Sequence, residues 1–165
     1  MADSEIPETG SRGSCDQEQV AMDKLTPDRR SRNMRQIRGK NTVPELRVRR
    51  LCREIGFSGY RIHRKDLPGK PDLAWIGRKL AIFVHGCFWH GHGCAEGIRK
   101  PKTNLDYWIP KITRNQQRDA EDIAALRAAD WVVIVVWECE LSEIDCLTKK
   151  LQRFLSFKAS GPNAK

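Results

Sequence analysis

The sequence has no long hydrophobic run. Of its 165 residues 39% are hydrophobic, and no stretch approaches the roughly eighteen consecutive apolar residues of a membrane-spanning helix. It also lacks a basic segment followed by an apolar one at its start, because residues 1–10 are acidic and polar, so no signal peptide is indicated. We therefore expect a soluble, cytoplasmic protein without a membrane partner. A chain of this length buries one core of ordinary size, which favours a single domain.

Acidic residues are scarce in one segment of the chain. Residues 24–53 contain eleven Lys or Arg and only two acids, Asp28 and Glu45, whereas residues 1–23 contain six acids and one base, Arg12. The formal net charge is +9. A basic segment is either a solvated face or a site for a polyanion. Because acids elsewhere do not balance this one, we favour nucleic acid as the partner.

The two ends of the chain lack an apolar period. Residues 1–23 mix Ser, Gly, Pro and acids, and residues 159–165 are equally poor in apolar side chains. Such composition is typical of disorder. We predict a disordered acidic N-terminal tail over 1–23, one folded domain over 24–158, and a flexible C-terminal tail over 159–165.

Within the domain, helical and strand patterns follow one another without an internal repeat. Thr42 and Glu45 form a capping box with Pro44 in the first turn, and Gly56 ends that helix. Helices, strands, a helix, a buried strand and a last helix together predict a mixed α/β sandwich. The predicted elements are a short helix after Thr26 carrying Met34 and Ile37, a helix over 42–55 with Leu46, Leu51 and Ile55 inward, a strand over 57–62, strands over 72–76 and 79–84, a helix over 105–129 with Ile109, Ile112, Ile123 and Leu126 inward, a strand over 131–136, and a helix over 144–157.

The two strands around Gly77-Arg78 define a register. If those residues are a two-residue hairpin turn, partners have numbers that sum to 155, and Asp72 faces Phe83. His85 is then the diagonal neighbour of Asp72, roughly 7 Å away at the β-carbons. A carboxylate and an imidazole at that separation can share a metal ion or a water. Alone, Asp72 is better explained as a strand-start residue satisfied by local backbone, and His85 is equally well explained as a core histidine. Together with His90, in the register above, they indicate a site for acid–base or metal chemistry.

Residues 86–104 lack any apolar period and are rich in Gly, His and Cys, so something other than a core must order them. Three cysteines and one histidine match a closed tetrahedral zinc site. The alternative is buried free thiols. The candidate zinc ligands are Cys87, His92, Cys94 and Cys139; we assign no role to Cys15, Cys52 and Cys146.

Four separated motifs resemble the very short patch repair endonucleases over about residues 26–157. They are Ser31-Arg32-Asn33-Met34, then Leu67-Pro68-Gly69-Lys70-Pro71-Asp72, then His85-Gly86-Cys87-Phe88-Trp89-His90, and Trp137-Glu138-Cys139. The resemblance implies a restriction-endonuclease-like fold and strand-specific nicking 5′ to the thymine of a T:G mismatch in double-stranded DNA. It also implies magnesium, two ions bridged by Asp72, and one structural zinc. We expect a monomer that other mismatch-repair proteins can accompany.

The resemblance also assigns residue roles. His85 and His90 look like the active-site histidines, with Asp119 orienting the second, and Glu45 resembles a helix glutamate beside the site. Val84 stands where the family has Thr and would offer magnesium its backbone carbonyl. Helix spacing puts Asp119, Asn115 and Trp108 on one face. The candidate DNA contacts are Phe88, Trp89 and Trp108 as intercalating rings, Met34 and Ile37 as wedges from the other groove, and Lys111, Asn115, Arg47 and Arg50.

Two other functions remain open at this point. A restriction-type nuclease of the same fold usually carries Glu-x-Lys on the second strand, where this chain has Phe83-Val84-His85. A zinc-ordered DNA-binding module without catalysis would use the same basic helices and aromatic rings. Cleavage of a T:G duplex in magnesium, absent on a T:A control, separates an enzyme from such a module.

Overall fold

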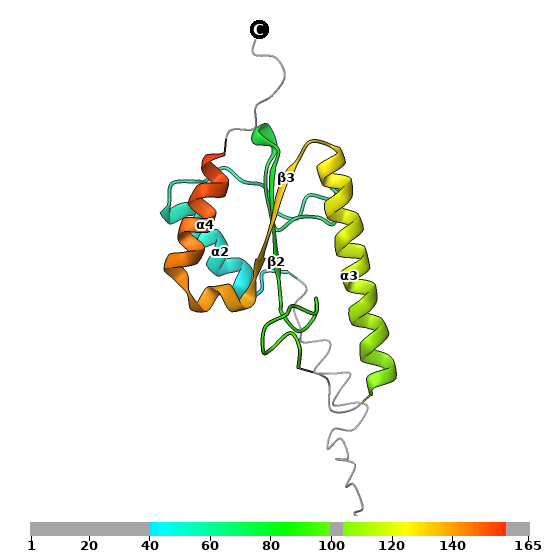
Figure 1. Cartoon of the computed structure of the whole chain (residues 1–165). Coiled ribbons are helices and arrows are strands. Elements are labelled where there is room, and N and C mark those ends of the chain that lie inside the picture. Colours follow the sequence, from blue (N-terminus) through cyan, green and yellow to red (C-terminus); the bar gives the residue numbers. More distant parts are fainter. Residues whose placement is uncertain (1–39, 100–103, 158–165) are drawn as a thin grey trace, which may run out of the picture.

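The computed structural model describes residues 40–99 and 104–157 (Figure 1). The regular elements alternate between helix and strand, as the sequence patterns predict. In chain order they are α2 (Val43–Glu54), β1 (Leu73–Trp75), a 3-10 turn (Ile76–Arg78), β2 (Leu80–His85), α3 (Leu105–Ala128), β3 (Val132–Trp137), a 3-10 turn (Glu138–Ser142) and α4 (Ile144–Ser156).

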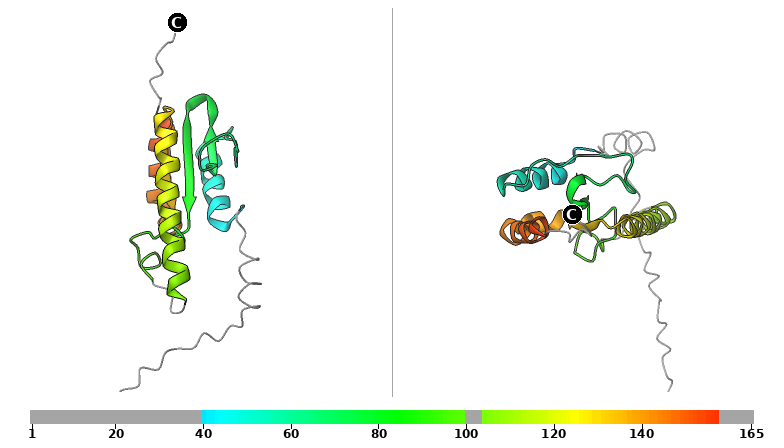
Figure 2. Two further views of the ribbon diagram at one scale, coloured as in Figure 1. Left: turned by 90° about the vertical axis from the view of Figure 1, so that its right-hand side faces the viewer. Right: turned by 90° about the horizontal axis from the view of Figure 1, so that it is seen from above.

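A three-stranded sheet lies between two layers of helix. The strand order is β1-β2-β3, with β1 antiparallel and β3 parallel to β2. Two parallel neighbours need a long crossover, and α3 provides it. Figures 1 and 2 show α2 and α4 on one face of the sheet and α3 on the other. The predicted mixed α/β architecture is confirmed.

Both faces of the sheet are packed. On the α2 and α4 side, alternate residues of β1 and β2 join the larger buried cluster, and on the α3 side the intervening residues join a smaller one. This agrees with the prediction that the apolar run at β3 is covered on both faces. The first cluster includes Val48, Cys52, Leu73, Leu80, Ile82, Val136, Leu147 and Leu151; the second includes Ala74, Ala81, Phe83, Leu126, Trp131 and Val133.

The register between β1 and β2 is the predicted one, although the turn is not. Leu73 pairs with Ile82 and Trp75 with Leu80, so partner numbers sum to 155. The chain reverses through a four-residue connection in which Lys79, with φ 49°, adopts the left-handed conformation. Gly77 has no positive φ, so the predicted two-residue turn with glycine first is wrong. Lengthening the turn by one residue at each end preserves the sum, and therefore the register.

The segment after α2 is not a strand. The predicted strand over 57–62 is reduced to a single antiparallel bridge between Arg61 and Ala74. The two residues exchange both backbone hydrogen bonds at 2.8 Å, but Gly59, with φ 84°, precedes the bridge and leaves extended geometry. The β propensity of Phe57, Tyr60 and Ile62 is overridden because the chain leaves extended geometry on both sides of the bridge, at Gly59 and again at His63 with φ 49°.

Two further details of the helices differ from the prediction. The buried face of α2 is built on Val48, Cys52 and the charged Glu45 and Arg49, while Leu46 is exposed. On α3, Ile109 is exposed as well. Several predictions fall outside the described residues. They concern Met34, Ile37 and the helix predicted to carry them, Cys15, and both predicted tails.

Among the described residues, no helix is both long enough and apolar enough to cross a membrane.

Candidate active site and metal-binding loop

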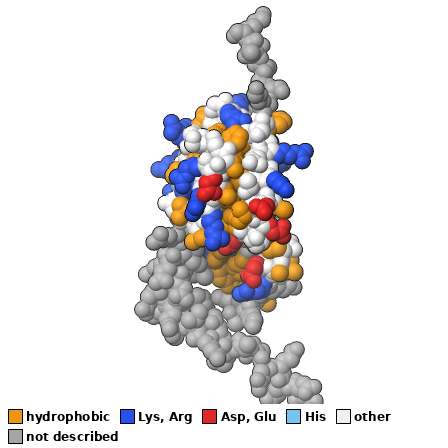
Figure 3. All heavy atoms as spheres, turned by 90° about the vertical axis from the view of Figure 1, so that its left-hand side faces the viewer, with side chains coloured by type: hydrophobic (Ala, Val, Ile, Leu, Met, Phe, Trp, Pro, Cys, Tyr) orange, Lys and Arg blue, Asp and Glu red, His pale blue; other side chains and the backbone are white. Residues whose placement is uncertain are grey.

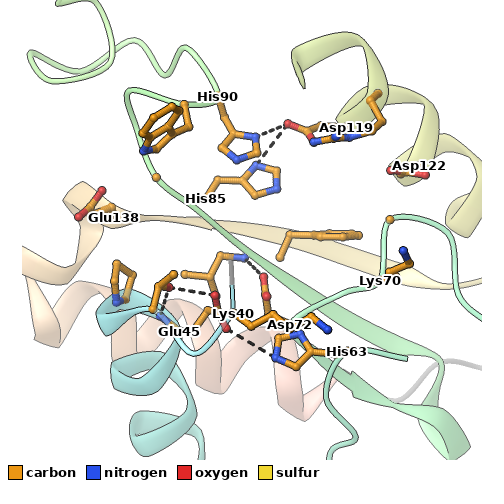
Figure 4. Close-up of a pocket in the computed structure, with 18 of the residues that line it drawn as sticks. Lys40, Glu45, His63, Lys70, Asp72, His85, His90, Asp119, Asp122 and Glu138 are labelled. Carbon is orange, nitrogen blue, oxygen red and sulfur yellow. Dashed lines mark hydrogen bonds and ion pairs between the residues drawn. The ribbon is translucent and has the colours of Figure 1, made fainter. Parts of the chain in front are cut away.

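A cavity of about 970 Å³ lies where β2 ends, between the α2 side and the α3 side of the sheet. Two groups of possible metal ligands line it, and within each group the ligand atoms lie within 4.8 Å of one another. Figure 4 shows the groups on opposite sides of the view. One group is Glu45, His63 and Asp72; the other is His85, His90 and Asp119.

The first group is built around Asp72, which precedes β1 by one residue. Its carboxylate oxygen Oδ2 accepts a hydrogen bond from the backbone N–H of Val84 at 2.7 Å, so the side chain caps the edge of β2. Glu45, buried on α2, accepts from Arg49 at 2.9 Å and from the backbone N–H of Asn41 at 2.9 Å. These bonds fix both carboxylates beside the cavity.

The carboxyl group of Asp72 is hard to ionise in this place. Its pKa is raised from 3.8 to about 6, chiefly by burial and also by the charge of Glu45, against the opposing effect of the Val84 N–H. A carboxylate that is costly to charge gains from a cation beside it. The donor set of two carboxylates, with the polar groups around them, therefore suits a divalent cation.

The second group joins β2, the following loop and α3. The rings of His85 and His90 stack with centroids 3.9 Å apart and an interplanar angle of 10°. Nδ1 of His90 is hydrogen-bonded to Oδ2 of Asp119, and Nδ1 of His85 lies 3.9 Å from the same oxygen. The predicted partnership of His90 with Asp119 is therefore present in the structure.

The environment shifts the protonation of His85 and Asp119. Burial, and next the neighbouring His90, lower the pKa of His85 to about 4. For Asp119, burial is the largest single influence and raises the pKa, but the hydrogen bond with His90 and the neighbouring charges of His90, His85 and Arg118 together leave the pKa below 3.8. At neutral pH His85 is a neutral imidazole and Asp119 an anion. A neutral imidazole accepts protons and binds metals, whereas a charged one does neither.

The sequence argument placed Asp72 and His85 in one site, and both do line the cavity. Their immediate partners differ from the expectation, since Asp72 groups with Glu45 and His63 while His85 groups with His90 and Asp119. The reason is the Val84 N–H, which draws the Asp72 carboxylate to the strand edge.

The four predicted zinc ligands also come together. One ligand atom from each of Cys87, His92, Cys94 and Cys139 lies within 4.8 Å of the others. Sγ of Cys139 is 3.5 Å from Nδ1 of His92, and the backbone N–H of Cys139 donates to Sγ of Cys87 at 3.4 Å. The hydrogen bond with His92 lowers the pKa of Cys94 to about 6, so a thiolate is accessible. Three sulfurs and one imidazole suit a tetrahedral soft-ligand site.

The loop that carries these ligands is tied to α3. Asn115 donates to the backbone carbonyl of Trp89 at 3.1 Å, and Gln116 to that of Gly91 at 3.3 Å. Gly91 has φ 61°, and a Cβ there would collide with the Gln116 amide. Asn115, predicted as a DNA contact, therefore also holds the loop against the helix.

Aromatic rings gather beside the cavity. The Trp89 and Trp108 centroids are 5.5 Å apart, and Phe88 lies 5.3 Å from Trp89. The Lys111 ammonium sits over the rings of Trp89, Tyr107 and Trp108 at 5.8, 5.1 and 5.3 Å. Trp89 and Trp108 are half-buried, whereas Trp75 and Trp131 are core residues, as predicted. A cluster of rings outside the core suits stacking on bases.

Sequence reasoning missed His63, Lys70 and Arg118, which line the cavity. The signal for His63 was weak, because it lies in an irregular segment without a motif. Predicted Arg47 and Arg50 are exposed on α2, where Arg50 pairs with Glu54 at 2.7 Å. Figure 3 shows the face of the molecule that carries α2 and α4, with Lys and Arg along its flanks and fewer acids nearer its middle.

Comparison with known proteins adds independent findings. Residues 22–96 match the family described as DNA mismatch endonuclease Vsr. A type II nicking enzyme of Xanthomonas oryzae pv. oryzae is 53% identical over 133 residues, which cover 81% of this chain and 96% of the relative. A type II nicking enzyme of Neisseria meningitidis serogroup A is 41% identical over 81% of this chain and 94% of its own length. The DNA mismatch endonuclease Vsr of Escherichia coli K12 is 40% identical over 72% of this chain and 75% of its own.

Proposed function

Because the chain belongs to the Vsr family of DNA mismatch endonucleases, we propose that it nicks one DNA strand 5′ to the thymine of a T:G mismatch, using Mg²⁺, and so starts very short patch repair. Family membership makes the chain a DNA endonuclease and implies a restriction-endonuclease-like fold. It also sets aside a DNA-binding module without catalysis. The observation that carries the finer proposal is the cavity with its two ligand groups next to the aromatic cluster.

In this proposal the first ligand group holds the magnesium. Asp72 would bind the ions, together with the backbone carbonyl of Val84, and Glu45 lies beside them. When bound, magnesium neutralises charge on the scissile phosphate and activates water. The raised pKa of Asp72 supports this assignment, since a cation offsets the cost of ionising a buried carboxyl group.

The second group would manage the proton. Asp119 is hydrogen-bonded to Nδ1 of His90, so the other ring nitrogen, Nε2, is directed away from Asp119. His90 is thereby placed to accept the proton of the attacking water or to relay it. His85 stacks on that ring and limits its rotation. A positioned general acid or base contributes roughly 10² to 10⁴ in rate.

The aromatic cluster would provide mismatch recognition. Inserting a ring between base pairs costs a few kcal/mol of unstacking per step, and a T:G wobble pair is already weakened, so insertion is easier there. Phe88, Trp89 and Trp108 stand beside the cavity, with Lys111 above two of the three rings. Met34 and Ile37 are proposed as wedges from the opposite groove on sequence grounds alone.

Structural zinc is the proposed ion for the four-ligand group of the loop. The donor set of Cys87, His92, Cys94 and Cys139 fits one Zn²⁺, and the ion would order a segment that has little apolar packing. We also propose that the protein acts on DNA in the cytoplasm as a monomer. Other mismatch-repair proteins would accompany it in repair, but nicking itself would not require them.

The direct test replaces Asp72 by Asn, which keeps the shape and an acceptor for Val84. We expect Asp72→Asn to abolish Mg²⁺-dependent nicking of a T:G duplex while binding of that duplex survives, because the basic residues and aromatic rings remain. Nicking is measured on labelled T:G and T:A duplexes. The matched control is Asp66→Asn, an exposed aspartate that pairs with Arg64 outside the cavity. Full turnover by Asp72→Asn at saturating magnesium would overturn the proposed site.

A further inference from the structure

His63 lies close to both carboxylates of the first ligand group although it comes from a different segment. Glu45 is on α2, Asp72 precedes β1, and His63 lies in the irregular connection between them. One ligand atom from each lies within 4.8 Å of the other two. Figure 4 shows His63 beneath Asp72, joined by a dashed line to Glu45. The three side chains therefore enclose one point of the cavity wall.

The backbone places His63 opposite Asp72 by register. Arg61 and Ala74 form an antiparallel bridge, and antiparallel partners have a constant sum, so position 63 falls opposite position 72. His63 then departs from extended geometry, with φ 49°. The left-handed region is strained for a residue other than glycine, and such residues concentrate at functional sites. The bridge and this turn together direct the imidazole at the carboxylates.

The hydrogen bonds of His63 show which ring nitrogen carries a lone pair. Nε2 of His63 lies 3.2 Å from a guanidinium nitrogen of Arg49. Arginine has donors only, so Nε2 must accept, and the ring proton must be on Nδ1. The same Nε2 lies 3.9 Å from Oε2 of Glu45. Nε2 is thus unprotonated, which is the form in which imidazole binds a metal. A cation bound there would take the Nε2 lone pair in place of the Arg49 N–H.

The surrounding contacts hold the Glu45 carboxylate in place. Three donors fix the Glu45 carboxylate, namely the Asn41 N–H, the Thr42 hydroxyl and Arg49. Arg49 is itself buried and bonded to the Asn41 side chain at 2.6 Å. With two carboxylates and one guanidinium, the group carries a net charge of about −1. This negative charge attracts a divalent cation.

We propose that His63 completes, with Glu45 and Asp72, a mixed nitrogen and oxygen site that binds Mn²⁺ in preference to Mg²⁺. Magnesium favours oxygen ligands and near-ideal octahedral geometry. An imidazole nitrogen favours first-row transition metals, and affinity for a given site rises from Mn²⁺ onward along that series. The inference rests on the proposed use of this cavity for a divalent cation, and it specifies which cation the residues select.

The first experiment detects the ligand directly. One equivalent of Mn²⁺ is added to the zinc-replete full chain without DNA, and electron spin-echo envelope modulation is recorded. We expect ¹⁴N modulation from a histidine ligand in the parent and in His90→Gln, and its loss in His63→Gln. Glutamine keeps an acceptor for Arg49, so folding should be retained, which circular dichroism checks. Modulation that persists in His63→Gln, or that is missing in the Mn²⁺-loaded parent, overturns the proposal, as does a failure of the parent to bind Mn²⁺.

If His63→Gln does not fold, the double variant His85→Gln/His90→Gln tests the same point. Modulation retained in that variant, where His63 and His92 are the remaining histidines and His92 is engaged by zinc, supports His63 as the ligand. Loss of the modulation places the ion in the other ligand group and contradicts the proposal.

The second experiment measures selectivity by calorimetry. His63→Gln should weaken Mn²⁺ binding about tenfold or more and change Mg²⁺ binding by less than about threefold. An equal loss for both ions would mean that His63 only positions Arg49 and Glu45, and would overturn the selective role. Neither experiment uses DNA. Absence of T:G nicking by a parent that shows histidine-ligated Mn²⁺ would therefore refute the proposed function alone.

Discussion

At the scale of single residues, the most informative group is the carboxyl of Asp72. It is a half-buried acid, and burial raises its pKa to about 6. In the unfolded chain the same group ionises near 3.8. Its ionised form is therefore disfavoured in the folded, metal-free protein. The residue best placed to bind a cation is a cost to stability when the cation is absent.

This cost predicts a gain in stability for Asp72→Asn in magnesium-free, zinc-replete protein. Below about pH 3.8 the parent carries the proton in both states and loses no stability. Between about pH 3.8 and 6 the unfolded chain releases the proton while the folded parent retains it, so the stability of the parent falls, and the loss is complete above about 6. We expect Asp72→Asn to exceed the parent by on the order of 1–3 kcal/mol at pH 7.5, with the difference vanishing near pH 4. Urea denaturation at both pH values measures it.

The pH dependence is the part that a general packing effect would not reproduce. A difference between Asp72→Asn and the parent that is the same at pH 4 and pH 7.5 would contradict the ionisation argument. Addition of magnesium should reverse the order at pH 7.5, because the parent alone gains binding energy that stabilises the folded state.

At the scale of elements, the loop after β2 depends on its ligands and on α3. Residues 86–99 contain no regular helix or strand in the structure, and Asn115 and Gln116 of α3 hold the loop at two points. Two amide hydrogen bonds contribute only about 1 kcal/mol each. That is too little to order a segment of this length, so an ion at the Cys and His group is the larger expected contribution.

We predict one tightly held zinc ion per chain, lost on Cys94→Ser. Removal of one sulfur ligand should release the ion and lower Tm by at least about 5 °C, because the loop loses its main source of order. Elemental analysis and thermal denaturation provide the two readings. Cys146→Ser is the control, since Cys146 is exposed and outside the ligand group. Protein purified without chelator that contains no zinc would refute the assignment.

The aromatic cluster gives a second prediction at this scale. If Trp89 enters the duplex at the mismatch, Trp89→Ala should lower the preference for T:G over T:A about tenfold or more, since stacking is worth about 1–3 kcal/mol per base. Trp89→Phe keeps a ring and should lose less. Binding of both duplexes is measured by fluorescence anisotropy.

The salt slope of binding should hardly change in Trp89→Ala, because the ring makes no charge contact with phosphate. An equal weakening of both duplexes, or loss of the folded state, would mean that Trp89 belongs to the packing of the loop. Its contacts with Phe88 and Trp108 make that outcome a real alternative.

At the scale of the whole molecule, different residues carry the positive charge and the proposed recognition of the mismatch. The net charge of +9 favours any polyanion, whereas His85, His90 and Trp89 line the cavity, with Trp108 next to Trp89. Phosphate contacts position a protein on the duplex but carry no sequence information. The basic surface should therefore determine affinity, and the cavity should determine selectivity.

The matching prediction concerns Arg47, which is exposed on α2 near the cavity. If it contacts phosphate, Arg47→Ala should weaken T:G and T:A duplexes alike and reduce the salt slope by about one. Arg127→Ala, at the far end of α3, is the control and should leave the slope unchanged. Binding is measured over a range of salt concentrations. A selective loss of T:G binding would show that Arg47 reads the mismatch.

The sequence by itself determined the local features of this protein. The capping pair Thr42 and Glu45 fixed the start of α2, the apolar run fixed β3, and the strand patterns around Gly77 fixed the β1–β2 register even though the turn was misjudged. The spacing of Cys87, His92 and Cys94, with Cys139 after β3, was enough to predict that the four would meet. These features depend on short-range geometry, which residue periodicity reports directly.

Only the tertiary structure decided how the candidate site divides. The Val84 N–H drew Asp72 toward Glu45, and the Arg61–Ala74 bridge brought His63 to the same point. Arg49 is buried, where it pairs with Glu45 on the same helix. The contacts of Asp72 and His63 have no period or motif, since each depends on backbone hydrogen bonds between separate segments of the chain. Such contacts exist only once the sheet and its helices have packed.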